Sequence, residues 1–374
     1  MNVLYFAHNV EDAAVLKRAR HLRHFGARVQ IIGFSRFSSS PKIVEEPIIF
    51  GRTFDGRFFQ RSVETGKAII RMREHRRHLD EADLIICRNL EALAVAIVAL
   101  RVAGLKRPVF YECLDIHAKM LAGNPASRLL RWLERRLIRE TAGLITSSGA
   151  FVREYFSPIQ RYDGAVILLE NKLLPSDFTP SQFDNPVPDS PPWIIGWFGI
   201  IRCRKSLKML DEITKVGNVR VHIAGRVSHT QIPDFENTLE KNPNITYSGP
   251  YVASDIPALF GACHFVWAID YYEEGKNSSW LLPNRLYDSL AAKRVPIALA
   301  QVETGRWLRE YNAGKVVESP VEDLTDFLQT LTAEGFVKHQ EQVKQVPNSA
   351  IFHDADSLRF IFTADARTHD HDDR

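Results

Sequence analysis

Long apolar runs are missing from this chain of 374 residues. A helix that spans a bilayer needs about 18 to 20 consecutive apolar residues, and no segment approaches that length. The opening residues, MNVLYFAH, have the pattern of a buried strand and lack the basic start of a cleavable signal peptide. We therefore expect a cytoplasmic protein.

Cysteine is scarce and scattered. The four cysteines are Cys87, Cys113, Cys203 and Cys263, and no two of them form a CxxC pair or a cluster with histidine. This spacing argues against a zinc site and against a disulfide framework. We expect four buried, unreactive thiols.

Several nucleotide-binding and metal-binding motifs are also missing. The chain has neither the GxxxxGK[ST] phosphate loop nor the GxGxxG dinucleotide fingerprint. Asp270 and Glu273 lie close together, but they do not form the DxD triplet with which GT-A glycosyltransferases hold a metal ion. We expect a metal-independent protein without a bound cofactor.

The composition is that of an ordinary globular protein, with 45% hydrophobic and 25% charged residues. A chain of this length exceeds what one hydrophobic core supports, so two domains are expected. In the first half, short apolar runs at residues 3–6, 28–33, 84–87, 109–112, 144–146 and 166–169 alternate with helical periodicity at residues 12–25, 90–102 and 127–141. Such alternation predicts a parallel sheet with helices on both faces.

A proline-rich stretch, LPSDFTPSQFDNPVPDSPP, interrupts this alternation, which restarts at residue 193. We therefore predict a first domain at residues 1–172, a linker at 173–192, a second domain at 193–345, a helix within 346–366 that packs back on the first domain, and a flexible tail at 367–374. The fold class is α/β, with two Rossmann-like, doubly wound domains facing a central cleft, since ligands bind at the carboxyl ends of parallel strands.

The segment GWFGIIRCRKS, residues 196–206, combines a glycine with cations at the start of a helix. We expect the strand to end in a turn at Gly199, where backbone N–H groups can approach an anion. Arg202 and Lys205 follow, near the positive end of the helix dipole. The segment suits a diphosphate, although an ordinary turn before a basic helix would have the same pattern.

A second segment, NSSWLLPNRLYDSLAAKRVPIA, begins at residue 277 and joins a polar loop to a helix and a buried strand. Ser278 and Ser279 lie in the loop, where they could meet a phosphate or a sugar. Asp288 follows Asn284 by one helical turn, so both lie on the same face near the helix start. A carboxylate there can accept hydrogen bonds from ribose hydroxyls.

Together these two segments resemble the donor-binding half of family 4 GT-B glycosyltransferases. YFAHNVEDAAVLKRARHLRHFGARVQIIGF and YECLDIH also resemble bacterial exopolysaccharide glucosyltransferases of the succinoglycan-assembly type. The resemblance implies a GT-B fold, a diphosphate site at Arg202 and Lys205, and a ribose contact at Asp288. It also implies that the first domain binds the acceptor and the second the donor. The chain departs from the family's EX7E pair, because Trp280 stands where the first glutamate is expected.

Polar residues follow the strand at 109–111, at the edge of the sheet where ligands bind. An inverting transferase needs a base within reach of the acceptor hydroxyl. Asp115 is our first choice and His117 our second, while either residue could instead cap the next helix. We expect Glu112 to lie on the acceptor side with His8 and Asn9, which follow the first strand.

Arginines crowd two stretches of the first half, although the net charge of the chain is only +3. One stretch contains Arg71, Arg73, Arg76 and Arg77, and the other contains Arg128, Arg131, Arg135, Arg136 and Arg139. The second stretch has helical apolar spacing, which indicates an amphipathic helix with a cationic face. This face could be solvated, or it could bind anionic lipids. No nucleic-acid-binding motif accompanies the charge.

These observations favour a transferase on the cytoplasmic face of the inner membrane. It would move a hexose, taken as glucose, from a UDP-sugar to a lipid-linked oligosaccharide during exopolysaccharide assembly. Two alternatives stay open. One is a catalytically silent, nucleotide-binding scaffold, which the missing glutamate at Trp280 suggests. The other is a non-hydrolysing UDP-sugar epimerase, which also has two Rossmann-like halves.

Overall fold

The computed structural model describes residues 1–36, 46–53, 58–177 and 187–359. The chain divides into two compact units. Unit 1 contains Met1–Leu169 together with the chain from Asp354 onward, and unit 2 contains Glu170–His353. Each unit has its own sheet and its own hydrophobic core.

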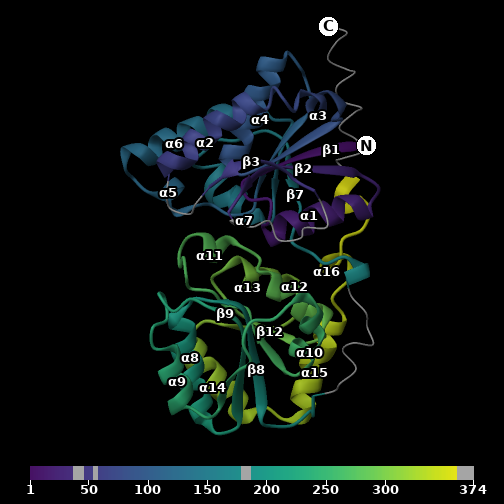
Figure 1. Cartoon of the computed structure of the whole chain (residues 1–374). Coiled ribbons are helices and arrows are strands. Elements are labelled where there is room, and N and C mark those ends of the chain that lie inside the picture. The colour runs from purple at the N-terminus through teal and green to yellow at the C-terminus, as the bar shows by residue number, and fades with distance from the viewer. Residues whose placement is uncertain (37–45, 54–57, 178–186, 360–374) are drawn as a thin grey trace. The chain divides into compact units, whose positions relative to one another are not determined.

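The sheet of unit 1 has seven strands in the order β3-β2-β1-β4-β5-β6-β7, and every pairing is parallel (Figure 1). Its strands are β1 (Asn2–Ala7), β2 (Arg28–Ser35), β3 (Ile48–Arg52), β4 (Leu84–Arg88), β5 (Val109–Cys113), β6 (Gly143–Thr146) and β7 (Val166–Leu168). Six of them match the predicted apolar runs. The remaining strand, β3, was not predicted; it lies at the edge of the sheet, and Ile49 and Arg52 in it are exposed.

The helices of unit 1 cover both faces of this sheet. They are α1 (Ala13–His24), α2 (Phe58–Arg71), α3 (Arg76–Glu81), α4 (Leu90–Ala103), α5 (Ala118–Leu121), α6 (Pro125–Ile138) and α7 (Gly149–Phe151), followed by a π-helical turn at Val152–Phe156. Because side chains alternate along a strand, β1 contributes to two cores. Tyr5 packs with Val15 and Leu22 of α1, whereas Phe6 faces Phe50 of β3, with ring centroids 6.4 Å apart.

Unit 2 repeats the architecture with six parallel strands in the order β10-β9-β8-β11-β12-β13. Its strands are β8 (Trp193–Ile201), β9 (Val219–Val227), β10 (Ile245–Tyr247), β11 (Phe265–Trp267), β12 (Val295–Leu299) and β13 (Lys315–Val317). Its helices are α8 (Arg204–Ile213), α9 (Phe235–Lys241), α10 (Ile256–Gly261), α11 (Asn277–Trp280), α12 (Asn284–Ala291), α13 (Glu303–Glu310), α14 (Pro320–Thr330), α15 (Ala333–Lys344) and α16 (Asn348–Ile351). The prediction of two doubly wound α/β halves is confirmed.

The strand β8 does not end at Gly199 as the sequence analysis expected. It pairs with β9 over nine residues and continues to Ile201. Gly199 lies opposite Gly225, and their φ angles are 116° and 136°. A Cβ atom on Gly225 would lie 1.7 Å from the carbonyl oxygen of Gly199. The two glycines therefore let the strand pair bend and continue, instead of ending β8 in a turn.

The helix expected within residues 346–366 is interrupted in its described part. The helix α16 ends at Ile351, and Phe352 is extended. Asp354 then accepts a hydrogen bond from the backbone N–H of Ser357, at 2.9 Å, which starts a separate short turn at Asp356–Leu358. Leu358 is fully buried in the core of unit 1. The remaining residues of that prediction, and the predicted tail at 367–374, lie outside the described residues.

The predicted linker at 173–192 falls in unit 2, and its residues 178–186 lie outside the described part. Its first residues are attached to the end of the unit. The backbone N–H of Leu173 donates to Ile351 O at 3.0 Å, and His353 N–H donates to Leu173 O at 2.8 Å. The chain therefore enters and leaves unit 2 along two adjacent segments.

Candidate functional site

The predicted diphosphate cations lie where β8 ends and α8 begins. Arg202 follows the last residue of β8, and Lys205 is the second residue of α8. The thiol of Cys203 caps this helix by accepting the backbone N–H of Ser206 at 3.3 Å. The capped start of α8 thus follows the end of β8 after only two intervening residues.

Both cations contact the loop that joins β11 to α11. The Arg202 guanidinium stacks on the ring of Tyr272, 4.1 Å from its centroid, and lies 3.8 Å from a carboxylate oxygen of Asp270. The Lys205 ammonium lies 4.0 Å from the ring centroid of Tyr271 and bonds both oxygens of Glu274, at 2.8 and 3.0 Å. Each predicted cation therefore rests on an aromatic ring beside a carboxylate.

The side chains of Ser278 and Ser279 shape this same loop. The hydroxyl of Ser278 accepts the backbone N–H of Glu273, and that of Ser279 accepts the N–H of Gly275, both at 2.9 Å. Ser278 is buried. The structure thus gives both serines a local role in positioning the loop, and their predicted contact with a donor stays a prediction.

The helix α12 places the predicted ribose residues as expected from their spacing. Asn284 is exposed at its first position, and Asp288 is half-buried one turn later. Tyr251, which follows β10, lies close enough to Asp288 for an electrostatic interaction. Burial, aided by the negative charge of Asp288, raises the pKa of the Tyr251 phenol, while Arg285 acts to lower it.

Arg285 is a residue of this site that the sequence analysis did not select. It lies between Asn284 and Asp288 in the first turn of α12 and is half-buried. Burial lowers the pKa of its guanidinium, and the positive charge of Arg202 lowers it further. The negative charge of Asp270 opposes this change but does not outweigh it. Its position in the first turn of α12, next to Asn284 and three residues before Asp288, is the sequence feature that could have identified it.

Aromatic residues of this half divide between core and surface. Trp267 is fully buried in the core, as expected for a central strand. Tyr271 is also buried, and burial, with a smaller contribution from Glu274, raises the pKa of its phenol to about 12. Tyr272 is 42% exposed, and Trp280 at the end of α11 is half-buried. Only the last two present surface for stacking.

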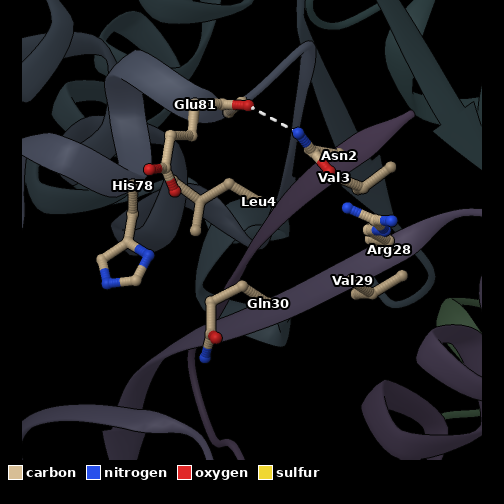
Figure 2. A pocket seen from close by; sticks show the side chains of 9 residues that line it. Asn2, Val3, Leu4, Arg28, Val29, Gln30, His78 and Glu81 are labelled. Carbon is tan, nitrogen blue, oxygen red and sulfur yellow. Dashed lines mark hydrogen bonds between the residues drawn. The ribbon is translucent and has the colours of Figure 1, made fainter.

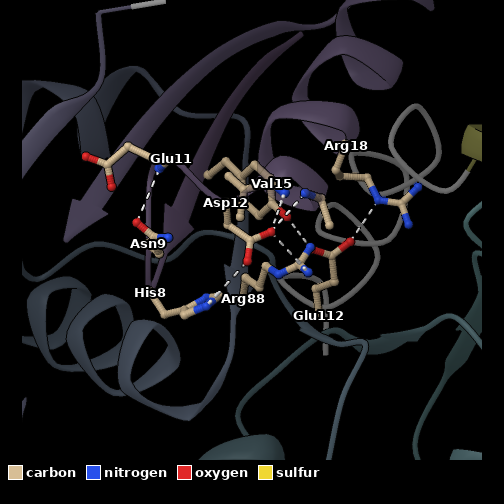
Figure 3. Close-up of polar contacts among 10 residues, drawn as sticks. His8, Asn9, Glu11, Asp12, Val15, Arg18, Arg88 and Glu112 are labelled. Atoms are coloured by element: carbon tan, nitrogen blue, oxygen red, sulfur yellow. Dashed lines mark hydrogen bonds and ion pairs between the residues drawn. The ribbon is translucent and has the colours of Figure 1, made fainter. Parts of the chain in front are cut away.

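In unit 1, polar side chains gather at the carboxyl ends of β1, β4 and β5 (Figure 3). Glu112 is fully buried, its carboxylate accepting hydrogen bonds from Arg18 Nε, at 2.8 Å, and from the Tyr5 hydroxyl. Arg88 is 3.6 Å from the same carboxylate. Burial and the adjacent Glu112 raise the pKa of Tyr5. Arg18 and Tyr5 therefore hold the Glu112 carboxylate inside unit 1, and its predicted place on the acceptor side stays a prediction.

The residues His8, Asn9 and Asp12 extend this cluster toward the surface. Asp12 caps α1 by accepting the N–H groups of Ala14 and Val15, at 2.8 and 3.3 Å. His8 lies 3.9 Å from Asp12. Burial acts to raise the pKa of Asp12, but Arg88, His8 and the two backbone bonds outweigh it and lower the pKa. Asn9 is buried, whereas His8 is half-buried beside an ionised carboxylate.

Asp115 and His117 are both exposed after β5, as a base that meets an acceptor must be. The Nδ1 atom of His117 accepts the backbone N–H of Lys119 at 3.1 Å and so caps α5. The capping alternative thus holds for His117. The N-cap of α5 is His117 and not Asp115, and the choice of base between the two residues stays a prediction.

The two arginine-rich stretches are partly neutralised. Arg76 and Arg77 pair with Asp80 and Glu81 one turn further along α3. In α6, Arg131 donates to the carbonyls of Met120 and Ala122, and Arg135 to those of Ile159 and Gln160. The outward face of α6 retains exposed arginines around two apolar side chains, Leu129 and Trp132, which are 64% and 59% exposed.

A hollow of about 500 Å³ lies in unit 1 at the amino ends of β1 and β2 (Figure 2). It is lined by Asn2, Val3, Leu4, Arg28, Val29, Gln30, His78, Glu81 and Ala82. None of the predicted site residues lines it, and it lies at the opposite edge of the sheet from the carboxyl ends, where ligands of such sheets bind.

All four cysteines are buried and unbridged, as expected. Burial raises the pKa of the Cys263 thiol to about 12 and also raises the pKa values of Cys87 and Cys113. Within the described ranges, no group of three histidine, cysteine or acidic side chains could hold a metal ion. No helix in those ranges is long and apolar enough to cross a membrane.

No family model matches the chain. A curated relative, the succinoglycan biosynthesis protein ExoL of Rhizobium meliloti (strain 1021), is 39% identical over 364 residues, which cover 94% of this chain and 90% of the relative. This likeness is far above what a shared fold alone produces.

Solved structures of similar fold include sucrose-phosphate synthase from Thermosynechococcus elongatus, with a TM-score of 0.72, 11% identity and 99% of each chain covered. The lipopolysaccharide outer core galactosyltransferase WaaB has a TM-score of 0.68 at 11% identity, covering 98% of this chain and all of the other. Anabaena HepE, solved in complex with UDP-glucose, has a TM-score of 0.66 at 15% identity, with the same coverage. The two-sheet architecture is the GT-B fold.

Proposed function

Because this chain belongs to the GT-B glycosyltransferase family that includes the succinoglycan biosynthesis protein ExoL, we propose that it transfers a hexose from a UDP-sugar to a lipid-linked oligosaccharide in exopolysaccharide biosynthesis. We take the hexose to be glucose. The observation that carries the proposal is the pair Arg202 and Lys205, two cations at the bent end of β8 and the start of α8. HepE, which shares the fold, binds UDP-glucose.

On this proposal unit 2 binds the donor. Arg202 and Lys205 bind the diphosphate, which is the leaving group of the transfer. Negative charge develops on it as the glycosidic bond breaks, so cations held in place there stabilise the transition state more than the ground state. Their rings, Tyr272 and Tyr271, orient both side chains. Asp288 binds the ribose, and no metal ion takes part.

Asp115 of unit 1 is the proposed base. Its exposed carboxylate follows β5 at the edge where ligands of parallel sheets bind. It would take the proton of the acceptor hydroxyl as that oxygen attacks the anomeric carbon. His8 and Asn9 are the proposed acceptor contacts, and His117 is the second choice for the base.

The outward face of α6 is the proposed contact with the inner membrane. Its exposed arginines can attract anionic headgroups, and Leu129 and Trp132 can enter the interface between headgroups and acyl chains. Such a contact would keep the enzyme on the cytoplasmic surface, where a lipid-linked acceptor lies.

Transfer from UDP-glucose to membrane lipid extract tests the proposal. Lys205→Ala should lower turnover about a hundredfold, because one charge-stabilising donor to the leaving group is lost. Asp115→Asn should keep UDP binding and lose turnover. Lys215→Ala is the matched control, since Lys215 lies just beyond the other end of α8 and pairs with Asp211. Wild-type turnover in Lys205→Ala would contradict the donor site, and an active Asp115→Asn enzyme would move the base to His117.

Trp280 motivates the alternative of a silent nucleotide-binding scaffold, because it occupies the position of the family's first glutamate. A scaffold would bind UDP but neither hydrolyse UDP-sugar nor transfer its hexose to the extract. Turnover of UDP-sugar without any acceptor would instead indicate the epimerase. The same assay therefore separates the three functions.

A further inference from the structure

Arg285 is a cation at the carboxyl edge of the unit 2 sheet whose charge the protein leaves without a close partner. In the part of the chain that the structure describes, it has no hydrogen bond and no carboxylate within ion-pair distance. It is nevertheless half-buried, in the first turn of α12. Partial burial of a charge without a hydrogen-bonded partner is unfavourable, and an anionic ligand would offset that cost.

The surroundings of Arg285 favour an anion with more than one charge. Arg202 is near enough to act on it as a like charge, and Asp270 acts on it as the opposite charge. The same Asp270 is also the partner of Arg202, at a loose 3.8 Å. Asp270 therefore pairs loosely with Arg202, and it acts on Arg285 only from beyond ion-pair distance. A diphosphate could satisfy both guanidinium groups, because a guanidinium donates paired hydrogen bonds that match phosphate oxygens.

The packing of α12 directs Arg285 toward this edge. Leu286, Tyr287 and Leu290 are buried and attach the helix to the core. Tyr287 also donates a hydrogen bond to Glu170 at 2.9 Å. Arg285 lies in the same turn and interacts electrostatically with Arg202, Tyr251 and Asp270, which follow β8, β10 and β11. The packed helix thus holds the guanidinium within electrostatic range of Arg202.

We propose that Arg285 is a third diphosphate-binding cation of the donor site, acting together with Arg202 and Lys205. The inference rests on the proposed function, since it assumes a nucleoside diphosphate as the donor's anionic part. Of the parts of a UDP-sugar, only the diphosphate carries charge, so Arg285 discriminates UDP from uridine.

Titration with UDP and with uridine, the probes that differ only in the diphosphate, tests this role. Arg285→Gln should weaken UDP binding about ten- to a hundredfold, as expected for lost hydrogen bonds to a charged group, and leave uridine binding unchanged. Arg204→Gln is the matched control. Arg204 opens α8 but donates to Asp234, at 2.8 and 3.2 Å, so its loss should change UDP binding less than about twofold.

Thermal unfolding without nucleotide separates a binding role from a structural one. Because the Arg285 charge is half-buried and lacks a close partner, Arg285→Gln should unfold at the wild-type temperature or above it. Arg285→Lys keeps the charge but not the planar fork, and UDP affinity between those of wild type and Arg285→Gln would support the proposal.

Unchanged UDP binding in Arg285→Gln, with a wild-type chain that does bind UDP, would overturn the role of Arg285 and leave the proposed function intact. Equal losses for UDP and uridine would overturn it as well, because a diphosphate contact cannot affect uridine. A wild-type chain that binds no UDP would instead overturn the proposed donor, and this inference with it.

Discussion

Gly225 is the residue whose replacement should be least tolerated in unit 2. Its φ is 136°, and a Cβ atom there would lie 1.7 Å from the carbonyl oxygen of Gly199 on the paired strand. Gly225→Ala should lower the free energy of unfolding by about 3 kcal/mol or more, because backbone strain and steric overlap add. Urea unfolding followed by the fluorescence of Trp193 and Trp197, both on β8, measures this loss.

Gly217→Ala provides the matched control for that experiment. Gly217 also has a positive φ, 87°, but a Cβ atom there meets nothing within 4 Å. Because only the backbone strain applies, Gly217→Ala should lower the free energy of unfolding by about 1 to 2 kcal/mol. Equal losses in the two variants would show that the approach of Gly199 to Gly225 does not constrain the strand pair.

At the residue scale, sequence reasoning found side chains whose chemistry is visible in one segment. Arg202, Lys205 and Asp288 stood out because each follows a recognisable turn or helix start. Arg285 did not stand out, because its proposed role depends on Asp270 and Arg202, which lie in other segments of the chain. Glu112 was assigned to the acceptor side from its place near the end of a predicted strand. Its burial and its hydrogen bond from Tyr5 depend on residues distant in sequence and could not be predicted.

The helix α6 is the element on which membrane binding should depend. Replacing both Leu129 and Trp132 with alanine should weaken binding to anionic vesicles about tenfold or more, because their apolar surface would no longer enter the interface. Cosedimentation with vesicles of phosphatidylglycerol and phosphatidylethanolamine measures this. The fold should be unaffected, since both side chains are exposed.

Val252→Ala is the matched control for α6, because Val252 is 65% exposed but belongs to unit 2. It should leave vesicle binding unchanged. Wild-type binding by the double variant would exclude α6 as the membrane contact. Equal binding to neutral and anionic vesicles would contradict the part of the proposal that concerns its arginines.

At the element scale, strands and helices with strong periodicity were predicted with ends within about three residues of the observed ones, because the exact ends depend on partners elsewhere in the fold. The strand β8 was expected to stop at Gly199, but its pairing with β9 carries it to Ile201. The edge strand β3 was missed because its apolar run is short and half of it faces solvent. The end of α16 at Ile351 depends on contacts with Leu173, which is distant in sequence.

The stability of the whole molecule depends on pH, and His264 should contribute strongly to this dependence. Burial, partly opposed by the hydrogen bond to Pro188 O, lowers the pKa of this imidazole to about 4. Its Nδ1 accepts the backbone N–H of Ile194 at 2.9 Å, so its Nε2 donates to Pro188 O at 2.8 Å. The folded protein therefore holds the neutral ring.

Between about pH 6.5 and pH 4 the unfolded chain binds a proton at His264 that the folded chain does not. The free energy of unfolding should therefore fall as the pH falls through this window, by up to about 3 kcal/mol from this residue. In His264→Asn, which cannot titrate, the stability difference from wild type should narrow over the same window. A constant difference, measured by urea unfolding at pH 7, 5.5 and 4.5, would contradict this account.

At the scale of the whole chain, the sequence predicted two parallel-sheet units, because strand and helix alternate on both sides of a proline-rich break. The boundaries between the two units could not be predicted as exactly from the sequence. Unit 2 begins at Glu170, before the predicted linker, and ends at His353. The composition of a segment does not show in which core its side chains are buried. Leu358, for example, follows unit 2 in the sequence but is buried in the core of unit 1.

The burial of Leu358 in unit 1 has a consequence for the order of events during synthesis. Residues of unit 1 come from both sides of unit 2, so unit 2 is an uninterrupted insertion within it. On the ribosome, the whole of unit 2 emerges before Leu358 is available to unit 1. Unit 2 can thus fold first, while unit 1, whose first part emerges earlier, completes this part of its core only after Leu358 has been added.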